Sequence, residues 1–269
     1  MTRLLPPLVV AGLAALAAVL LVLVPSSEPG DALVPRTAVI VDQLALTSPG
    51  PGFVSSATAT LQAAGYAVDY VPSEQVTVDF YRELPSRGYG LVIVRAHSGF
   101  ALRDPAALTE ELRGQGETFL FSSEPYSEER YQQDQAKRRL SIAFYFDPTG
   151  AEQDLDALLA AFQSLPRYFG IKPGFIESSA RGRFPGSTVI LMGCNGLSTD
   201  ALAKAFVAKG ARAVAGWDDL VTAEHTDRVT SILLAHLLID NLPLDTAVAR
   251  TASELGPDPS YGGKVTLYR

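Results

Sequence analysis

The chain has 269 residues, 47% of them hydrophobic, and a formal net charge of −7, which is enough length for one large hydrophobic core or two small ones. Because acidic residues are scattered and no basic stripe occurs, we expect no nucleic-acid partner. One cysteine excludes an internal disulfide and a Cys-x-x-Cys site, and three dispersed histidines do not suggest a metal cluster, so we expect no metal and no cofactor.

The N-terminal run Leu4–Val24 is uncharged and about 21 residues long, so as a helix it would match a hydrocarbon core of roughly 30 Å. Arg3 precedes the run and a Pro-rich, acidic stretch follows it, which predicts a cytoplasmic N-terminus and an extracytoplasmic main domain. We therefore expect a single-pass anchor over residues 1–24 that contacts the lipid bilayer through 4–24, and a linker over 25–36. A cleaved signal peptide is the alternative, although the run is longer than a usual signal core and no clear Ala-x-Ala follows it.

From Thr37 the chain alternates short β-branched runs with helical patterns. Strands are expected at Ala38–Leu44, Ala67–Val71 and Tyr89–Ala96, with helices at Phe53–Ala64 and Val78–Leu84 between them. Strands that alternate with helices predict a mostly parallel sheet with helices on both faces.

The middle of the chain is less regular. Strand-like runs at Thr118–Phe121 and Leu140–Phe146 surround the charged stretch Ser127–Arg139, which predicts a hairpin or flap inserted around 104–150. Helices are expected at Ala106–Arg113 and Asp154–Leu165.

The alternation of strands and helices then resumes and continues to the end of the chain. Strands are expected from Thr188, over Ala211–Trp217 and, at the sheet edge, over Lys264–Tyr268. Helices are expected over Thr199–Lys209, Thr226–Ile239 and Thr246–Leu255. No repeat and no second-domain boundary occurs, so we expect one α/β domain over 37–269.

Two turns carry the residues that are most able to take part in catalysis. His97 follows one apolar run and Cys194, the only cysteine, follows another, and both therefore lie beyond the carboxyl ends of predicted strands. That edge of an open α/β sheet commonly holds reaction sites. A thiol reacts as the thiolate, which a helix N-terminus and a facing imidazole stabilise, and the flanking Gly99 and Gly196 leave room for backbone amides at an oxyanion. The alternatives are a buried, inert Cys194 and a His97 that serves only as a hydrogen-bonded turn residue.

The order of these blocks resembles the caspase–gingipain–legumain class of cysteine peptidases, with a His after one hydrophobic block and Gly-Cys-x-Gly between the next strand and a helix. The segment Leu202–Asp219 also resembles the helix and strand that follow the cysteine in caspase-like CHAT domains. The resemblance implies a caspase-like three-layer sandwich, a catalytic dyad of His97 and Cys194, and an oxyanion hole of backbone amides near Gly99 and Cys194.

The chain also departs from this family. Ser98 intervenes where the family usually has His-Gly, and Met192 stands where several branches carry an Asp of a basic-residue pocket. Asp218 and Asp219, after the next strand, are the remaining candidates for binding a Lys or Arg side chain of a substrate, or they cap the next helix.

The other histidines give weaker alternatives. Cys194 followed by His225 has the order of glutamine-amidotransferase-like hydrolases, but Gly193 directly before the cysteine does not fit their Gly-x-Cys-x-Gly turn, and His225 is expected at the surface or at the start of a helix. His236, between two leucines, is expected to pack.

Together these features predict a membrane-anchored, extracytoplasmic cysteine endopeptidase that acts on a peptide or protein. The alternatives are a catalytically inactive caspase-like binding module of the cell envelope and a purely structural envelope protein.

Overall fold

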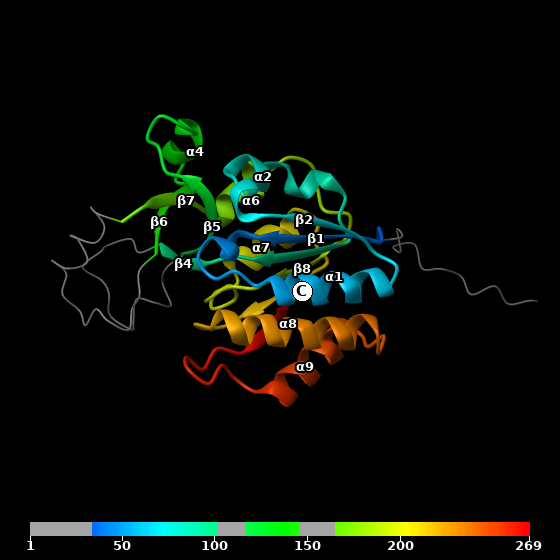
Figure 1. Ribbon diagram of the computed structural model, residues 1–269. Helices are drawn as coiled ribbons and strands as arrows, with labels where there is room; N and C mark the ends of the chain where they lie inside the picture. The colour runs from blue at the N-terminus through cyan, green and yellow to red at the C-terminus, as the bar shows by residue number, and fades with distance from the viewer. Residues whose placement is uncertain (1–33, 102–116, 146–164) are drawn as a thin grey trace, which may run out of the picture. The chain divides into compact units, whose positions relative to one another are not determined.

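A computed structural model describes residues 34–101, 117–145 and 165–269 (Figure 1). Its larger sheet has six strands in the order β10-β9-β8-β3-β1-β2. Five of them are parallel and β10 is antiparallel to β9. In chain order the strands are β1 (Thr37–Asp42), β2 (Ala67–Val71), β3 (Leu91–Arg95), β8 (Thr188–Leu191), β9 (Ala213–Trp217) and β10 (Val265–Tyr268). The predicted mostly parallel sheet is confirmed.

Helices cover both faces of this sheet (Figure 1). One face carries α1 (Pro51–Ala63), α8 (Ala223–Leu238) and α9 (Leu244–Leu255), and the other carries α2 (Val78–Glu83), α6 (Pro173–Ser178) and α7 (Ala201–Ala208). Short 3-10 helices lie at Gln43–Leu46, Ser73–Gln75 and Leu84–Arg87. Successive residues of a strand enter different cores, because Ile40 packs with the α1 face and Val41 with the α7 face.

A second, antiparallel sheet is inserted between β3 and β8. Its order is β4-β5-β7-β6, and its strands are β4 (Ser98–Ala101), β5 (Glu117–Pro125), β6 (Leu140–Phe144) and β7 (Arg167–Ile171). Its described strands begin at Ser98 and end at Ile171, so the insertion starts before and ends after the 104–150 expected from sequence.

The charged stretch Ser127–Arg139 contains the short helix α4 (Gln132–Ala136). Asp134 in this helix is buried, and its carboxylate accepts a hydrogen bond from Arg82 on α2 at 2.9 Å. The stretch is therefore bound to the body of the domain through an ion pair.

Several expectations lie outside the described residues: the anchor at 4–24 and the helices at Ala106–Arg113 and Asp154–Leu165. Within the described part of the chain, no helix combines the length and hydrophobicity needed to cross a bilayer.

Candidate active site

His97 and Cys194 follow neighbouring parallel strands. Leu91 to Val94 of β3 pair with Thr188 to Leu191 of β8, so the turns after these strands leave the sheet at the same edge. The two turns are in direct contact, because the Ser98 hydroxyl donates to the Cys194 carbonyl. A Cβ on Gly193 would lie 2.3 Å from the Ala96 carbonyl oxygen, so only glycine fits there. Both residues lie at the same edge of the sheet, as predicted from the sequence. Ser98, a departure from the family pattern, joins the two turns.

The His97 imidazole is held by residues that follow β1. Its Nε2 lies 2.7 Å from the Thr47 hydroxyl, and its backbone N–H donates to Gln43 Oε1 at 2.9 Å. The ring also packs against Tyr145, with 4.7 Å between ring centroids. Burial, and then the nearby Arg95 charge, lower the pKa of His97 to about 4. The ring is therefore neutral at pH 7 and can accept a proton.

Gln43 connects two parts of this site that are distant in sequence. It is fully buried, and its side-chain N–H donates to the Tyr145 hydroxyl at 2.6 Å while its oxygen accepts from His97. Neither Gln43 nor Thr47 was identified from sequence. The available signal was their position directly after the first strand, which lies beside β3 in a parallel sheet.

The Cys194 thiol has different partners. It donates to the Val221 carbonyl, with 3.4 Å between sulfur and oxygen, and accepts from the Val221 N–H at 3.5 Å. Its side chain packs with the core on the α8 side of the sheet. Burial raises the pKa of Cys194 despite the Val221 N–H, so the thiol is protonated at neutral pH.

His97 and Cys194 are thus close in the fold but separately bonded. Within the described part of the chain, no hydrogen bond joins the imidazole to the thiol. Thr47 contacts the Nε2 atom of His97, and no other described residue hydrogen-bonds Nδ1, so Nδ1 is the ring nitrogen that a thiol or substrate could use.

The predicted oxyanion residues differ in their surroundings. Gly99 belongs to β4 and pairs with Phe119 of β5, so it lies in a strand and not in a free turn. The turn of Cys194 continues into Asn195, which has a left-handed backbone with φ of 56°, and the Asn195 N–H donates to the Asp219 carbonyl at 2.9 Å.

The two acidic candidates for substrate binding have separate roles. The Asp218 carboxylate accepts from the Lys264 N–H at 2.7 Å, at the start of the edge strand. Asp219 is exposed, and one of its carboxylate oxygens accepts a hydrogen bond from the Leu220 N–H at 2.8 Å. Asp219 is therefore the better placed of the two to contact a ligand beside Cys194.

A buried ion-pair network at the same edge was missed from sequence. Arg95, at the end of β3 and 1% exposed, donates to Asp42 at 2.7 Å and to both carboxylate oxygens of Asp227 at 2.7 and 2.9 Å. The network ties β1, β3 and α8 together. Because its donors are occupied within the protein, we assign Arg95 a structural role.

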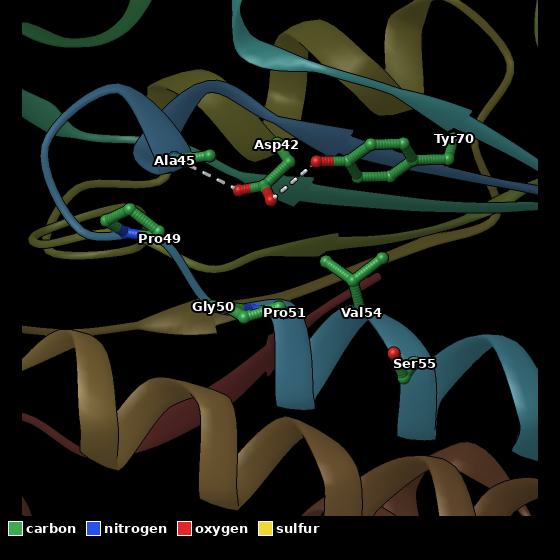
Figure 2. Close-up of a pocket in the computed structure, with 8 residues that line it drawn as sticks. All are labelled: Asp42, Ala45, Pro49, Gly50, Pro51, Val54, Ser55 and Tyr70. Carbon is green, nitrogen blue, oxygen red and sulfur yellow. Dashed lines mark hydrogen bonds between the residues drawn. The ribbon is translucent and has the colours of Figure 1, made fainter.

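A pocket of about 330 Å³ lies beside this network, between β2 and the start of α1 (Figure 2). Its walls are mostly apolar, and Asp42 lies at its inner side, bonded to the Tyr70 hydroxyl at 3.1 Å and the Ala45 N–H at 3.2 Å. The lining residues are Asp42, Ala45, Pro49, Gly50, Pro51, Val54, Ser55 and Tyr70. Along the sheet edge, the pocket at β1–β2 is followed by His97, then Cys194, then Asp219.

The remaining histidines do not join the site. His225 lies in the first turn of α8, where its N–H donates to Thr222 at 3.2 Å, in agreement with the expected helix start. Among the described residues, no group of three His, Cys, Asp or Glu side chains could hold a metal ion.

Comparisons with known proteins do not assign a family. No protein-family model matches the chain, and no curated protein is significantly similar to it in sequence.

Proposed function

We propose that the protein is a cysteine endopeptidase that uses Cys194 as nucleophile and His97 as acid–base. The observation that supports this most is that both residues follow adjacent parallel strands, on turns joined by Ser98. Nucleophilic catalysis needs the base within hydrogen-bond reach of the nucleophile, and neighbouring strand ends bring the two turns close enough for a side-chain rotation to achieve this.

The chemistry follows from these two groups. The thiol transfers its proton to neutral His97, and the thiolate attacks the peptide carbonyl carbon. The carbon–nitrogen bond then breaks, and the imidazolium returns the proton to the leaving amine. Water, deprotonated by His97, hydrolyses the thioester and frees Cys194.

The described arrangement corresponds to a resting enzyme. The thiol is bonded to Val221 and the imidazole to Thr47, and both shifts in pKa favour the neutral pair. Substrate binding must turn the thiol from Val221 toward Nδ1 of His97. A peptide along the sheet edge would contact the pocket at Tyr70 on one side and Asp219 on the other.

The pKa directions favour a second candidate, a caspase-like module that binds a peptide or envelope protein without cleaving it. A half-buried, protonated thiol that never leaves Val221 would make Cys194 a packing residue.

Hydrolysis of a peptide library by the full-length protein separates the two candidates. The peptidase predicts cleavage that is lost in Cys194→Ser and in His97→Ala, with Ser198→Ala as a matched control on the same turn. Binding of library peptides without cleavage in the wild type would support the binding module and reject the peptidase.

We also propose, from the sequence, that the enzyme is held at the extracytoplasmic side of a membrane. The uncharged run Leu4–Val24 anchors the chain in a bilayer, with the catalytic domain on the extracytoplasmic side. Accessibility of the domain to a protease added outside intact cells tests this, and protection of the domain would overturn it.

A further inference from the structure

Basic residues gather at the sheet edge opposite the candidate active site. The loops that lead into β1, β3, β8 and β9 span residues 34–36, 84–90, 179–187 and 209–212, and together they contain six basic residues and no acidic one. We call these six the basic edge: Arg36, Arg87, Arg181, Arg183, Lys209 and Arg212.

These loops lie side by side. The Thr37 hydroxyl donates to the Gly88 carbonyl at 3.0 Å, which joins the first loop to the second. A Cβ on Gly182 would lie 2.7 Å from the Ser86 Cβ, which places the second loop against the third. The Phe184 N–H donates to the Lys209 carbonyl at 2.9 Å, which joins the third loop to the fourth. The basic edge is therefore one continuous surface.

Most of this positive charge has no acidic partner within the described part of the chain. Arg181 pairs with Glu83 at 2.7 Å, and it is the one member of the basic edge with such an ion pair. Arg36 donates to the Ala64 carbonyl and Arg212 to the Thr188 hydroxyl, both neutral acceptors. Arg183 is exposed.

The opposite edge has the reverse charge. The loops after β1, β3, β8 and β9 span residues 43–50, 96–97, 192–200 and 218–222, and they carry three acidic residues, Asp200, Asp218 and Asp219, and no basic one. Charge in this acidic protein is thus separated between the two edges of one sheet, which gives the domain a preferred orientation in an electric field.

We propose that the basic edge docks onto anionic lipid headgroups and so holds the edge with His97 and Cys194 away from the bilayer. Arg36 ends the linker 25–36, whose 12 residues span at most about 40 Å from the apolar run Leu4–Val24. The chain therefore enters the domain at the basic edge and keeps that edge within reach of the headgroups. Surface charges act over about 8 Å at physiological ionic strength, so close approach is enough for attraction. The proposal uses the predicted anchor, and it is independent of peptidase chemistry.

The test uses the full-length chain and its only tryptophan, Trp217. The protein is combined with nanodiscs of phosphatidylcholine alone, or of phosphatidylcholine with phosphatidylglycerol, each carrying a dansyl-labelled lipid. Energy transfer from Trp217 to dansyl reports how close the domain lies to the headgroups. We expect more transfer in the anionic discs, and a return to the neutral-lipid level at about 0.5 M NaCl.

A double variant that reverses two charges of the basic edge tests whether this surface is the one that docks. Each basic residue near an anionic surface shifts the ratio of docked to free domain by about fivefold, so Arg183→Glu with Arg212→Glu should lower that ratio by about 25-fold or more. The matched control, Lys137→Glu with Arg228→Glu, changes net charge equally at exposed positions outside the basic edge and should retain docking.

Three results would overturn the proposal. Equal transfer in both lipids would mean that the domain does not recognise anionic headgroups. An equal loss of energy transfer in the control pair would mean that net charge, and not the basic edge, controls how closely the domain approaches the bilayer. Salt-sensitive binding of heparin without any response to phosphatidylglycerol would identify a soluble polyanion as the partner.

Discussion

At the scale of single residues, the environment of His97 makes a titration prediction. Burial and the Arg95 charge lower the pKa of His97 to about 4, so the folded protein binds this proton less readily than the unfolded chain does. The contribution of His97 to stability is therefore lost as pH falls from about 6.5 toward 4. An NMR titration of the imidazole should show a midpoint near 4, and a midpoint at 6.5 or above would contradict this description of the site.

Gly50 makes a packing prediction beside the buried ion pairs. A Cβ there would lie 2.6 Å from the Arg95 guanidinium and 2.9 Å from the Asp227 carboxylate, neither of which can move without leaving a buried charge unpaired. We expect Gly50→Ala to reduce the free energy of unfolding by about 1–3 kcal/mol. Gly52→Ala is the control, because nothing lies within 4 Å of its Cβ, and it should change stability by less than about 0.5 kcal/mol. Equal denaturation midpoints for the two variants would exclude this packing argument.

At the scale of elements, Asp258 fixes the start of α8. Its carboxylate accepts from the Thr222 N–H and hydroxyl and from the N–H groups of Ser260 and Tyr261, at 2.7–2.9 Å. Thr222 in turn caps the helix, which explains why α8 begins at Ala223, three residues before the predicted start. Burial alone would raise the pKa of Asp258, but these hydrogen bonds hold it below the usual value.

We therefore expect Asp258→Ala to lower the free energy of unfolding by about 1–3 kcal/mol at neutral pH, since four partly buried donors lose their charged acceptor. Because the pKa of Asp258 is lowered in the fold, its contribution is present above the usual carboxyl pKa and is lost as pH falls through the folded value. Urea unfolding of wild type and variant should show a difference that shrinks on acidification. A difference that grows in acid would contradict the assignment, and Thr222→Ser, which keeps the cap, should unfold like wild type.

His236 joins α8 to α9, although sequence suggested that it only packs. It is buried, and its ring nitrogens lie 2.8 Å from Asp240 and 3.0 Å from Glu254. Hydrogen bonds to Asp240 and then to Glu254 raise the pKa of His236. Both carboxylates are satisfied at once only by the doubly protonated ring.

A raised histidine pKa stabilises the fold below the unfolded value, and that stability is lost as pH rises through the folded value. The melting temperature of wild type should therefore exceed that of His236→Gln by more at about pH 5.5 than at about pH 8.5. Arg228→Gln, on an exposed position of the same helix, should show no such trend. A constant gap between wild type and His236→Gln across this range would show that the imidazole does not titrate against these carboxylates.

Two strands were not predicted from the sequence, and the reason is physical. β4 has four residues and includes Gly99, so it lacks the β-branched run that marks a strand. β7 contains Gly170, where a Cβ would lie 2.6 Å from the Phe119 ring. From sequence that glycine indicates a break, whereas in the fold it makes room for an aromatic ring of the neighbouring strand.

At the scale of the whole molecule, sequence predicted which sheet edge carries His97 and Cys194 but not the hydrogen-bond partners of these residues. Alternating strands and helices required His97 and Cys194 to reach one edge of a parallel sheet. Their actual partners, Thr47, Gln43 and Val221, lie 27 to 54 positions away in sequence and carry no local signal. The basic edge could not be predicted from the sequence either, because its residues are spread from Arg36 to Arg212 and only the sheet brings them together.

The most direct test of the proposed peptidase is covalent labelling of Cys194 in the full-length protein at neutral pH. A peptidyl chloromethyl ketone with Lys in the position before the reactive group is compared with iodoacetamide, in wild type and in His97→Ala. We predict slow reaction with iodoacetamide, because the resting thiol is half-buried and protonated, and fast, His97-dependent alkylation by the peptide reagent, which recruits the thiol as a substrate would. Modification of Cys194 by either reagent only after unfolding would contradict the peptidase and leave Cys194 as a core residue of a binding module.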